Sequence, residues 1–407
     1  MLDTLYGDEH PAADAHWRPL LDGEEAAQAC AVAEEIIVAL EQQPPNQEHG
    51  FQGDASIALL LAHCGRSSAA ARVDSALNAF AARPPTISLF AGLSGVSWLI
   101  GQFSDEDDGE AGALMAHFDS ALLRHLDVPR WQERYDLITG LVGVGVYAAG
   151  RLGERADRIT DLVLSHLEAS AIASDAGTTW RTPPQYLAPP RRERFPTGVV
   201  DLGVAHGVPG IIGMLAQFVD ADVQPDRSRR LLRSAVAWLM NAVPDRLPRF
   251  GTNWPADPDE VARIGWCYGD PGVAGVLLRA SRTLRSPELE REALALLTQI
   301  AAPLATRCVP DACFCHGAAG LAHIYNVAFQ RTGSAQMRDQ ARRWLTEVLR
   351  RRTPGTGIAG YEFLKVDEES PRCAPDATLL SGVAGIALVL LAAVEDREPE
   401  WQALYAL

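Results

Sequence analysis

Two kinds of apolar segment alternate along the chain. One kind places apolar residues at i, i+3 and i+4 and fills the other face with arginine and glutamate, as in residues 230–239. This period is typical of an amphipathic helix with one wet side, so we expect these helices on the outside of the molecule. The pattern predicts them at 24–43, 67–83, 113–127, 154–171, 226–243, 286–305 and 334–352.

The second kind of segment opens with a G-x-x-G step and carries almost no charge in its first turns, which predicts burial on most sides. Six clear copies begin at Gly92, Gly140, Gly207, Gly269, Gly317 and Gly382, and a degenerate copy begins at Gly53. Seven buried and seven amphipathic helices in alternation predict an all-α fold, an (α/α) toroid barrel with seven inner and seven outer helices. A helical solenoid also alternates in this way and is the rival. In the toroid, the glycines would let the helix ends crowd together.

The repeats also decide the domain organisation. A length of 407 residues would suggest two or three domains, but the repeats predict a single domain over 1–407. Two stretches rich in proline, glycine and charge interrupt the alternation, near 172–203 and 353–381. Both are too long for ordinary connections, and we interpret them as inserted lids or binding loops.

Composition and charge exclude several classes of protein. The net charge is −16, which argues against a nucleic-acid binder. The only lysine, Lys365, follows no glycine-rich turn, which argues against a Walker phosphate loop and Schiff-base chemistry. The first residues lack a secretory signal, and the longest apolar run is half a membrane span. We therefore expect a cytoplasmic protein that is not an integral membrane protein, with its seven cysteines reduced.

Reactive residues recur just before the first glycine of the repeats. The inner helices of a toroid are parallel, so these positions should converge at one mouth. The residue before the glycine is Thr139, His206, Tyr268 or His316 in four successive repeats, and one position further back stand Cys267 and Cys315. We expect these side chains to form one site.

Cys267, Cys315 and His316 predict a metal site. Two cysteines and one histidine are a common set of protein ligands for Zn²⁺, and they leave a fourth position open to water or substrate. Cys313 is an alternative or a fourth ligand, which would close the site. Buried cysteines often act as small hydrophobic residues, and this is our interpretation of Cys30, Cys64 and Cys373.

Three motifs together carry a resemblance to a known family: Trp-Cys-Tyr-Gly at 266–269, Cys-His-Gly at 315–317 and Ala-His-Gly-Val-Pro-Gly at 205–210. They resemble the lanthionine synthetase C-like family, and within it the stand-alone class I lanthipeptide cyclases. The resemblance implies an α/α toroid with one central zinc. It also implies an enzyme that adds a peptide cysteine thiol to dehydroalanine or dehydrobutyrine, which forms a lanthionine or methyllanthionine thioether ring.

The same resemblance implies partners. The substrate would be a lanthipeptide precursor whose serines and threonines a separate dehydratase has dehydrated. The dehydratase, and an export transporter, would be partners in a biosynthetic complex that places the protein peripherally at the membrane.

Roles for four further residues follow from the resemblance. His206 would act as general acid or base and Asp136 would orient it, while Arg263 would stabilise the enolate and Tyr268 would donate a hydrogen bond or relay a proton. Structural roles are the alternatives: a helix cap for Asp136, a surface ion pair with Glu260 or Asp259 for Arg263, and packing for Tyr268. We interpret His63 and His323 as core histidines.

Two other functions fit part of the pattern. A zinc-containing protein that binds glutathione or another thiol without cyclase activity would keep the same ligands. Another toroid enzyme, such as a carboxylate-pair glycosidase or a prenyltransferase, would leave the Cys-His set without a purpose or would need phosphate-binding lysines.

Overall fold

Inner and outer helices alternate along the chain, as predicted. The computed structural model describes residues 16–82, 84–103, 109–151, 153–243, 249–254, 263–300, 309–366 and 371–407. Within these residues the inner helices are α2 (Asp54–His63), α4 (Leu93–Phe103), α6 (Leu141–Ala149), α9 (Val208–Asp220), α11 (Asp270–Leu284), α13 (Ala318–Thr332) and α15 (Val383–Ala392). The outer helices are α1 (Gly23–Glu41), α3 (Ala69–Ala82), α5 (Gly109–Leu126), α7 (Glu154–Ser170), α10 (Pro225–Ala242), α12 (Pro287–Ile300) and α14 (Ala335–Arg350).

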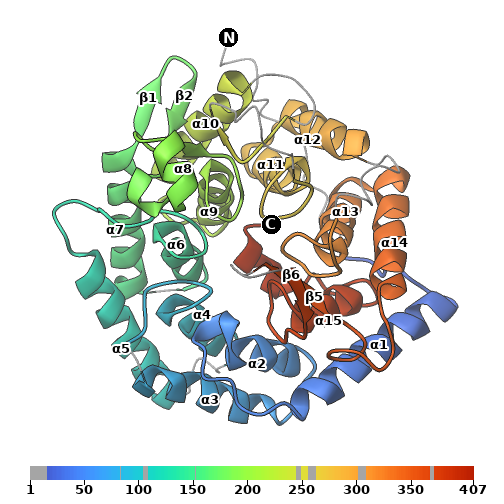
Figure 1. The fold of residues 1–407 in the computed structure, drawn as a ribbon. Coiled ribbons are helices and arrows are strands. Elements are labelled where there is room, and N and C mark those ends of the chain that lie inside the picture. The colour runs from blue at the N-terminus through green and yellow to red at the C-terminus, as the bar shows by residue number, and fades with distance from the viewer. Residues whose placement is uncertain are drawn as a thin grey trace.

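The two sets form concentric rings, which Figure 1 shows in a view down the centre of the molecule. Each inner helix packs against its two inner neighbours and against an outer helix. The inner helices are buried nearly all round, whereas the outer helices bury one face. The all-α toroid is therefore confirmed.

The ring is closed by its two ends. Helix α1 packs against α15, and α2 against α15, although they lie at opposite ends of the chain. The backbone N–H groups of Leu20 and Leu21 donate to the carbonyl of Ala393, at 2.8 and 3.0 Å. The ends of a solenoid would lie apart, so the solenoid alternative is wrong.

The glycines of the G-x-x-G step are required by the turn that precedes each inner helix. A Cβ atom on Gly272 would lie 2.0 Å from the carbonyl oxygen of Trp266, and one on Gly269 would lie 2.0 Å from that of Arg263. The second glycines of the other five clear repeats meet the matching carbonyl in the same way. The glycines therefore allow a close approach between two backbone segments of the same turn. The sequence had instead predicted that they would allow the ends of neighbouring helices to pack closely.

Backbone hydrogen bonds join the turns of neighbouring repeats, and we call this set the belt. The residue two positions before the first glycine donates its N–H to the carbonyl of the equivalent residue in the next repeat. The pairs are Phe90 to Ile138 (3.3 Å), Ala205 to Cys267 (3.4 Å), Cys267 to Cys315 (3.1 Å) and Cys315 to Leu380 (2.8 Å). Where the ring closes, the N–H of Leu379 donates to Oγ of Ser56 at 2.9 Å.

The insertions form short strands and helices. The first contains β1 (Ile172–Ser174), β2 (Gly177–Thr179), η2 (Pro184–Tyr186), α8 (Pro189–Arg194) and β3 (Val200–Asp201). The second contains β5 (Phe363–Val366) and β6 (Pro371–Ala374). The antiparallel pairs are β1 with β2, β5 with β6, and β3 with β4 (Asn253–Trp254). Strands of two to four residues are too short to show an alternating pattern, which is why the sequence did not predict them.

The C-terminal segment fills the centre of the ring, as Figure 1 shows. Tyr405, in the 3₁₀ helix η4 (Glu400–Tyr405), is fully buried and stacks on Phe314 with 3.7 Å between ring centroids. Its carbonyl accepts the indole N–H of Trp266 at 2.9 Å. Trp266 and Phe314 directly precede Cys267 and Cys315, so this segment supports the two turns that carry the cysteines.

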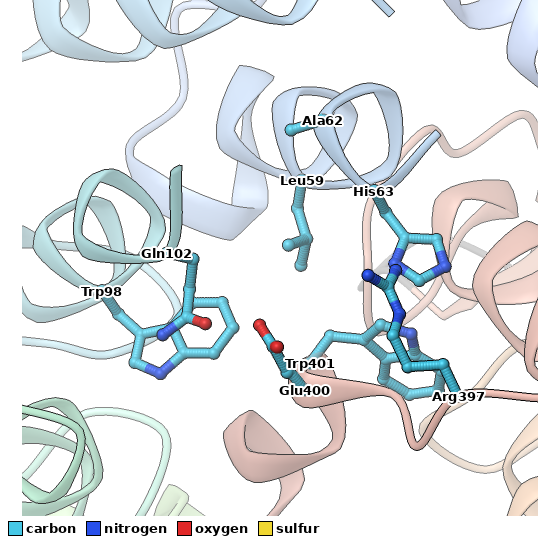
Figure 2. A pocket seen from close by; sticks show the side chains of 8 residues that line it. All are labelled: Leu59, Ala62, His63, Trp98, Gln102, Arg397, Glu400 and Trp401. Atoms are coloured by element: carbon cyan, nitrogen blue, oxygen red, sulfur yellow. The ribbon is translucent and has the colours of Figure 1, made fainter. Parts of the chain in front are cut away.

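A cavity of about 340 Å³ lies at the other end of the ring, where α2 and α4 finish. Figure 2 shows its lining: Leu59, Ala62, His63, Trp98, Gln102, Arg397, Glu400 and Trp401. The side chain of His63 is 8% exposed and its Nε2 lies 3.1 Å from Glu395, so His63 is a largely buried, paired histidine that borders this cavity. For His323, 1% exposed, the interpretation as a core histidine is confirmed, and burial lowers its pKa to about 3.

Of the three cysteines that the sequence assigned to the core, two are exposed. Cys30 and Cys373 are exposed and Cys64 is half-buried. Cys30 lies on the outer helix α1 and Cys373 on the short strand β6, where neither side chain is covered. The core interpretation is therefore wrong for Cys30 and Cys373, whereas Cys64 packs against the edge of the hydrophobic core. In a separate finding, no helix among the described residues is long and apolar enough to cross a membrane.

We predict that Gly272→Ala destabilises the fold by about 1–3 kcal/mol, since the new Cβ would overlap a backbone oxygen that cannot move alone. Gly112→Ala is the matched control, because Gly112 lies in α5 and a Cβ there would meet no atom within 4 Å. Alanine there should stabilise the helix by roughly 0.5–1 kcal/mol. Urea unfolding measures both, and equal stability of the two variants would contradict the turn geometry.

Candidate functional site

The belt brings the two cysteines predicted as metal ligands together. Cys267 precedes α11 and Cys315 precedes α13, and their backbones are joined directly. The ligand atoms of Cys267, Cys315 and His316 all lie within 4.8 Å of one another. Cys267 is 5% exposed, and the other two are half-buried. Two thiols and an imidazole at this spacing fit a tetrahedral zinc ion with one open position.

Hydrogen bonding favours ionisation of one thiol. The hydrogen bond from Cys315 lowers the pKa of the Cys267 thiol well below its ordinary value, and His316 and the charge of Arg263 act in the same direction against the effect of burial. A thiolate is the form of cysteine that binds metal. The arrangement of the protein groups therefore already suits a cation.

A buried carboxylate lies behind His316. Oδ2 of Asp311 has no hydrogen-bond partner among the residues that the structure describes, and it lies 3.7 Å from Nε2 of His316. Metal-binding histidines usually donate their second nitrogen to such a group. Cys313, the alternative ligand, is fully buried and forms a second group with Asp311 and His316, apart from Cys267 and Cys315.

His206 and Asp136 form a hydrogen-bonded pair across neighbouring repeats. Nδ1 of His206 donates to Oδ2 of Asp136 at 3.2 Å, and Asp136 also accepts the N–H of Thr139 at 2.7 Å. Burial would lower the pKa of His206, but the hydrogen bond and charge of Asp136 outweigh it, so that pKa is raised. Asp136 thus serves both as the turn cap and as the partner of the imidazole.

Tyr268 lies between His206 and Arg263. The ring centroids of His206 and Tyr268 are 6.2 Å apart, and the guanidinium carbon of Arg263 lies 5.7 Å from the Tyr268 ring. The surface ion-pair alternative for Arg263 involves residues 259 and 260, which lie outside the described residues. All seven residues predicted for the site are thus linked through short contacts at one mouth of the toroid.

Two carboxylates of this mouth were missed from the sequence. Asp201 accepts a hydrogen bond from the Tyr268 hydroxyl at 3.0 Å, and Asp311 lies beside His316. Each stands six residues before the first glycine of its repeat, a position that Arg263 also occupies. The repeat alignment would have found them had it been extended back beyond the two residues before the glycine.

The sequence model of the lanthionine synthetase C-like proteins matches residues 67–405, which is most of the chain. The chain belongs to the lanthionine synthetase C-like family. A solved structure titled "Nisin cyclase" is similar over 92% of this chain and 96% of its own, with a TM-score of 0.70 and 17% sequence identity. At that identity the likeness shows the fold. No curated protein sequence matches the chain significantly.

The family assignment agrees with the motifs that carried the resemblance. All three, at 205–210, 266–269 and 315–317, lie inside the matched range. Each ends in the G-x-x-G turn of an inner helix or leads into it. In this member of the lanthionine synthetase C-like family, the motif residues therefore share one mouth because they share one repeat position.

We predict that Asp136→Asn lowers the pKa of His206, because it removes the hydrogen bond and charge that raise it. The pair stabilises the folded state below about pH 6.5 as long as Asp136 is ionised; this contribution is lost as the pH rises through the folded-state pKa of His206, and also as the pH falls through the lowered pKa of Asp136. An NMR titration of the His206 ring, assigned by its absence in His206→Gln, measures the shift. Asp226→Asn, on the exposed side of α10, is the control, and an unchanged His206 pKa in Asp136→Asn would contradict the pairing.

Proposed function

We propose that this protein is a zinc-dependent lanthipeptide cyclase. The observation that carries the proposal is the placement of Cys267, Cys315 and His316 at the same mouth as the His206–Asp136 pair. Membership of the lanthionine synthetase C-like family and the shared fold with a nisin cyclase support it. The reaction adds a cysteine thiol of the peptide across a dehydroalanine or dehydrobutyrine residue.

Cys267, Cys315 and His316 would hold the zinc, and Asp311 would support the imidazole. Zinc, when bound, favours the thiolate form of a substrate cysteine at neutral pH. Three protein ligands would leave a fourth position for the substrate thiol. Cys313 groups with Asp311 and His316 and not with Cys267.

The remaining residues of the site would stabilise the negative charge that develops during the reaction and transfer the proton that completes it. The thiolate sulfur of the peptide supplies the electron pair for a carbon–sulfur bond at the β-carbon of the dehydro residue. The electron pair of the carbon–carbon double bond moves to form an enolate, which must then gain a proton at the α-carbon. Arg263 would stabilise the enolate oxygen by its positive charge. His206, whose pKa Asp136 raises, would act as general acid or base, and Tyr268 would donate a hydrogen bond or relay a proton.

The proposal includes a cellular setting. The substrate is a precursor peptide already dehydrated by a separate dehydratase, and an export transporter completes the complex. We place the protein in the cytoplasm, peripherally at the membrane within that complex. Residues 1–407 act as one domain, with the insertions near 172–203 and 353–381 at its rim.

We predict that Cys267→Ala and Cys315→Ala each lose bound zinc, whereas His206→Gln and Cys30→Ala retain it. Removing one of three ligands strips most of the binding free energy, while Cys30 is an exposed thiol remote from the site. Metal analysis after dialysis measures the stoichiometry. Zinc at full occupancy in both ligand variants would show that other residues hold it.

We predict that the wild-type protein removes alkylatable thiols from a dehydrated, cysteine-containing precursor peptide without changing its mass. His206→Gln should slow this on the order of 10²–10⁴-fold, the usual cost of a lost general acid or base. Alkylation followed by mass spectrometry counts the free thiols. If zinc is bound but every thiol stays alkylatable, the protein binds thiols without being a cyclase.

A further inference from the structure

Asp201 is a buried carboxylate at the mouth to which no role has been given. It ends β3, is 3% exposed, and uses both carboxylate oxygens. Oδ1 accepts the backbone N–H of Gly203 at 2.9 Å, and Oδ2 accepts the hydroxyl of Tyr268 at 3.0 Å. Burial raises its pKa to about 6, and the hydrogen bonds from Gly203 and Tyr268 offset part of the cost of an ionised carboxylate here.

A comparison with the other repeats shows which contact of Asp201 belongs to the general turn and which belongs to this site. Asp311 and Asp376 stand at the same repeat position, six residues before the first glycine. Their Oδ1 atoms also accept the N–H two residues later, from Cys313 at 2.9 Å and from Thr378 at 2.7 Å. The bond through Oδ1 is therefore a feature of the repeat turn, and at Asp201 the Oδ2 atom adds a bond from a tyrosine of the next repeat.

Asp201 also holds the backbone segment, at Gly203, against which the Tyr268 ring packs. A Cβ on Gly203 would lie 2.5 Å from Cε1 of Tyr268 and 2.6 Å from the carbonyl oxygen of Cys267. The ring thus packs directly on the backbone that Oδ1 of Asp201 holds. One carboxylate fixes both the hydroxyl and the ring of Tyr268, between His206 and Arg263.

We propose that Asp201 is a positioning residue, which holds the Tyr268 hydroxyl by a hydrogen bond between the fourth and fifth repeats and so fixes the ring for its part in cyclisation. The role in turnover rests on the proposed function, whereas the hold on Tyr268 does not. Asp201 acts only through Tyr268. Once the Tyr268 hydroxyl has been removed, replacing Asp201 should therefore cause no further loss of rate.

The first test is a double-mutant cycle of cyclisation rates. Asp201→Asn keeps an oxygen for the Gly203 N–H but presents an amide group where Oδ2 accepted the hydroxyl. We expect it to lower kcat about 10–100-fold with zinc content unchanged, as is usual for supporting residues. The variant carrying both Asp201→Asn and Tyr268→Phe should be no slower than Tyr268→Phe alone. Asp376→Asn, at the same turn position in the seventh repeat, should keep wild-type activity.

The second test does not need turnover. With 3-fluorotyrosine incorporated, the ¹⁹F signal of Tyr268, assigned by its absence in Tyr268→Phe, should shift in Asp201→Asn and not in Asp376→Asn. An unmoved signal, or losses that multiply in the double variant, would overturn the proposal. If the wild-type protein cyclises no peptide, the proposed function fails, and the ¹⁹F signal alone still decides whether Asp201 holds Tyr268.

Discussion

The belt of backbone hydrogen bonds between successive turns is the constraint on which the rest of the structure depends. Cys267 shows its effect, because its N–H donates to Cys315 and its carbonyl accepts from Ala205. Both backbone groups are used, so the turns of three repeats are fixed relative to one another. Residues far apart in the sequence thereby become neighbours at the mouth, with little freedom left to their backbones.

Hydrophobic packing holds the belt from inside the ring. The residue before each belt position is buried in all six clear repeats: Leu89, Leu137, Val204, Trp266, Phe314 and Leu379. Trp266 and Phe314 rest on the aromatic ring of Tyr405, whose hydroxyl also donates to the carbonyl of Leu379 at 3.3 Å. The C-terminal segment thus ties together the turns that carry Cys267 and Cys315, so the backbones of these two proposed ligands are held by a packed core.

Carboxylates set the electrostatic character of the mouth. Asp136, Asp201 and Asp311 are all buried there, next to His206, Tyr268 and His316 respectively. Carboxylates favour positive partners, and the guanidinium of Arg263 and the imidazoles of His206 and His316 lie at this mouth. The hydrogen bond and charge of Asp136 raise the pKa of His206, and the same electrostatic character would suit the cation proposed for Cys267, Cys315 and His316.

The sequence by itself determined the helix alternation, the number of repeats and the shared repeat position of Cys267, Cys315, His316, His206 and Tyr268, because each follows from a periodic pattern. It left a toroid and a solenoid as alternatives, and the packing of α1 and α2 against α15 decides for the closed ring. The sequence did not reveal the short strands, the central C-terminal segment or the roles of Asp201 and Asp311. A strand of two residues has no period. An aspartate in a sequence also gives no sign of whether its carboxylate only caps a turn or also accepts a hydrogen bond from a tyrosine of the next repeat. Only the tertiary structure decides between these, since the second partner comes from a turn more than sixty residues away.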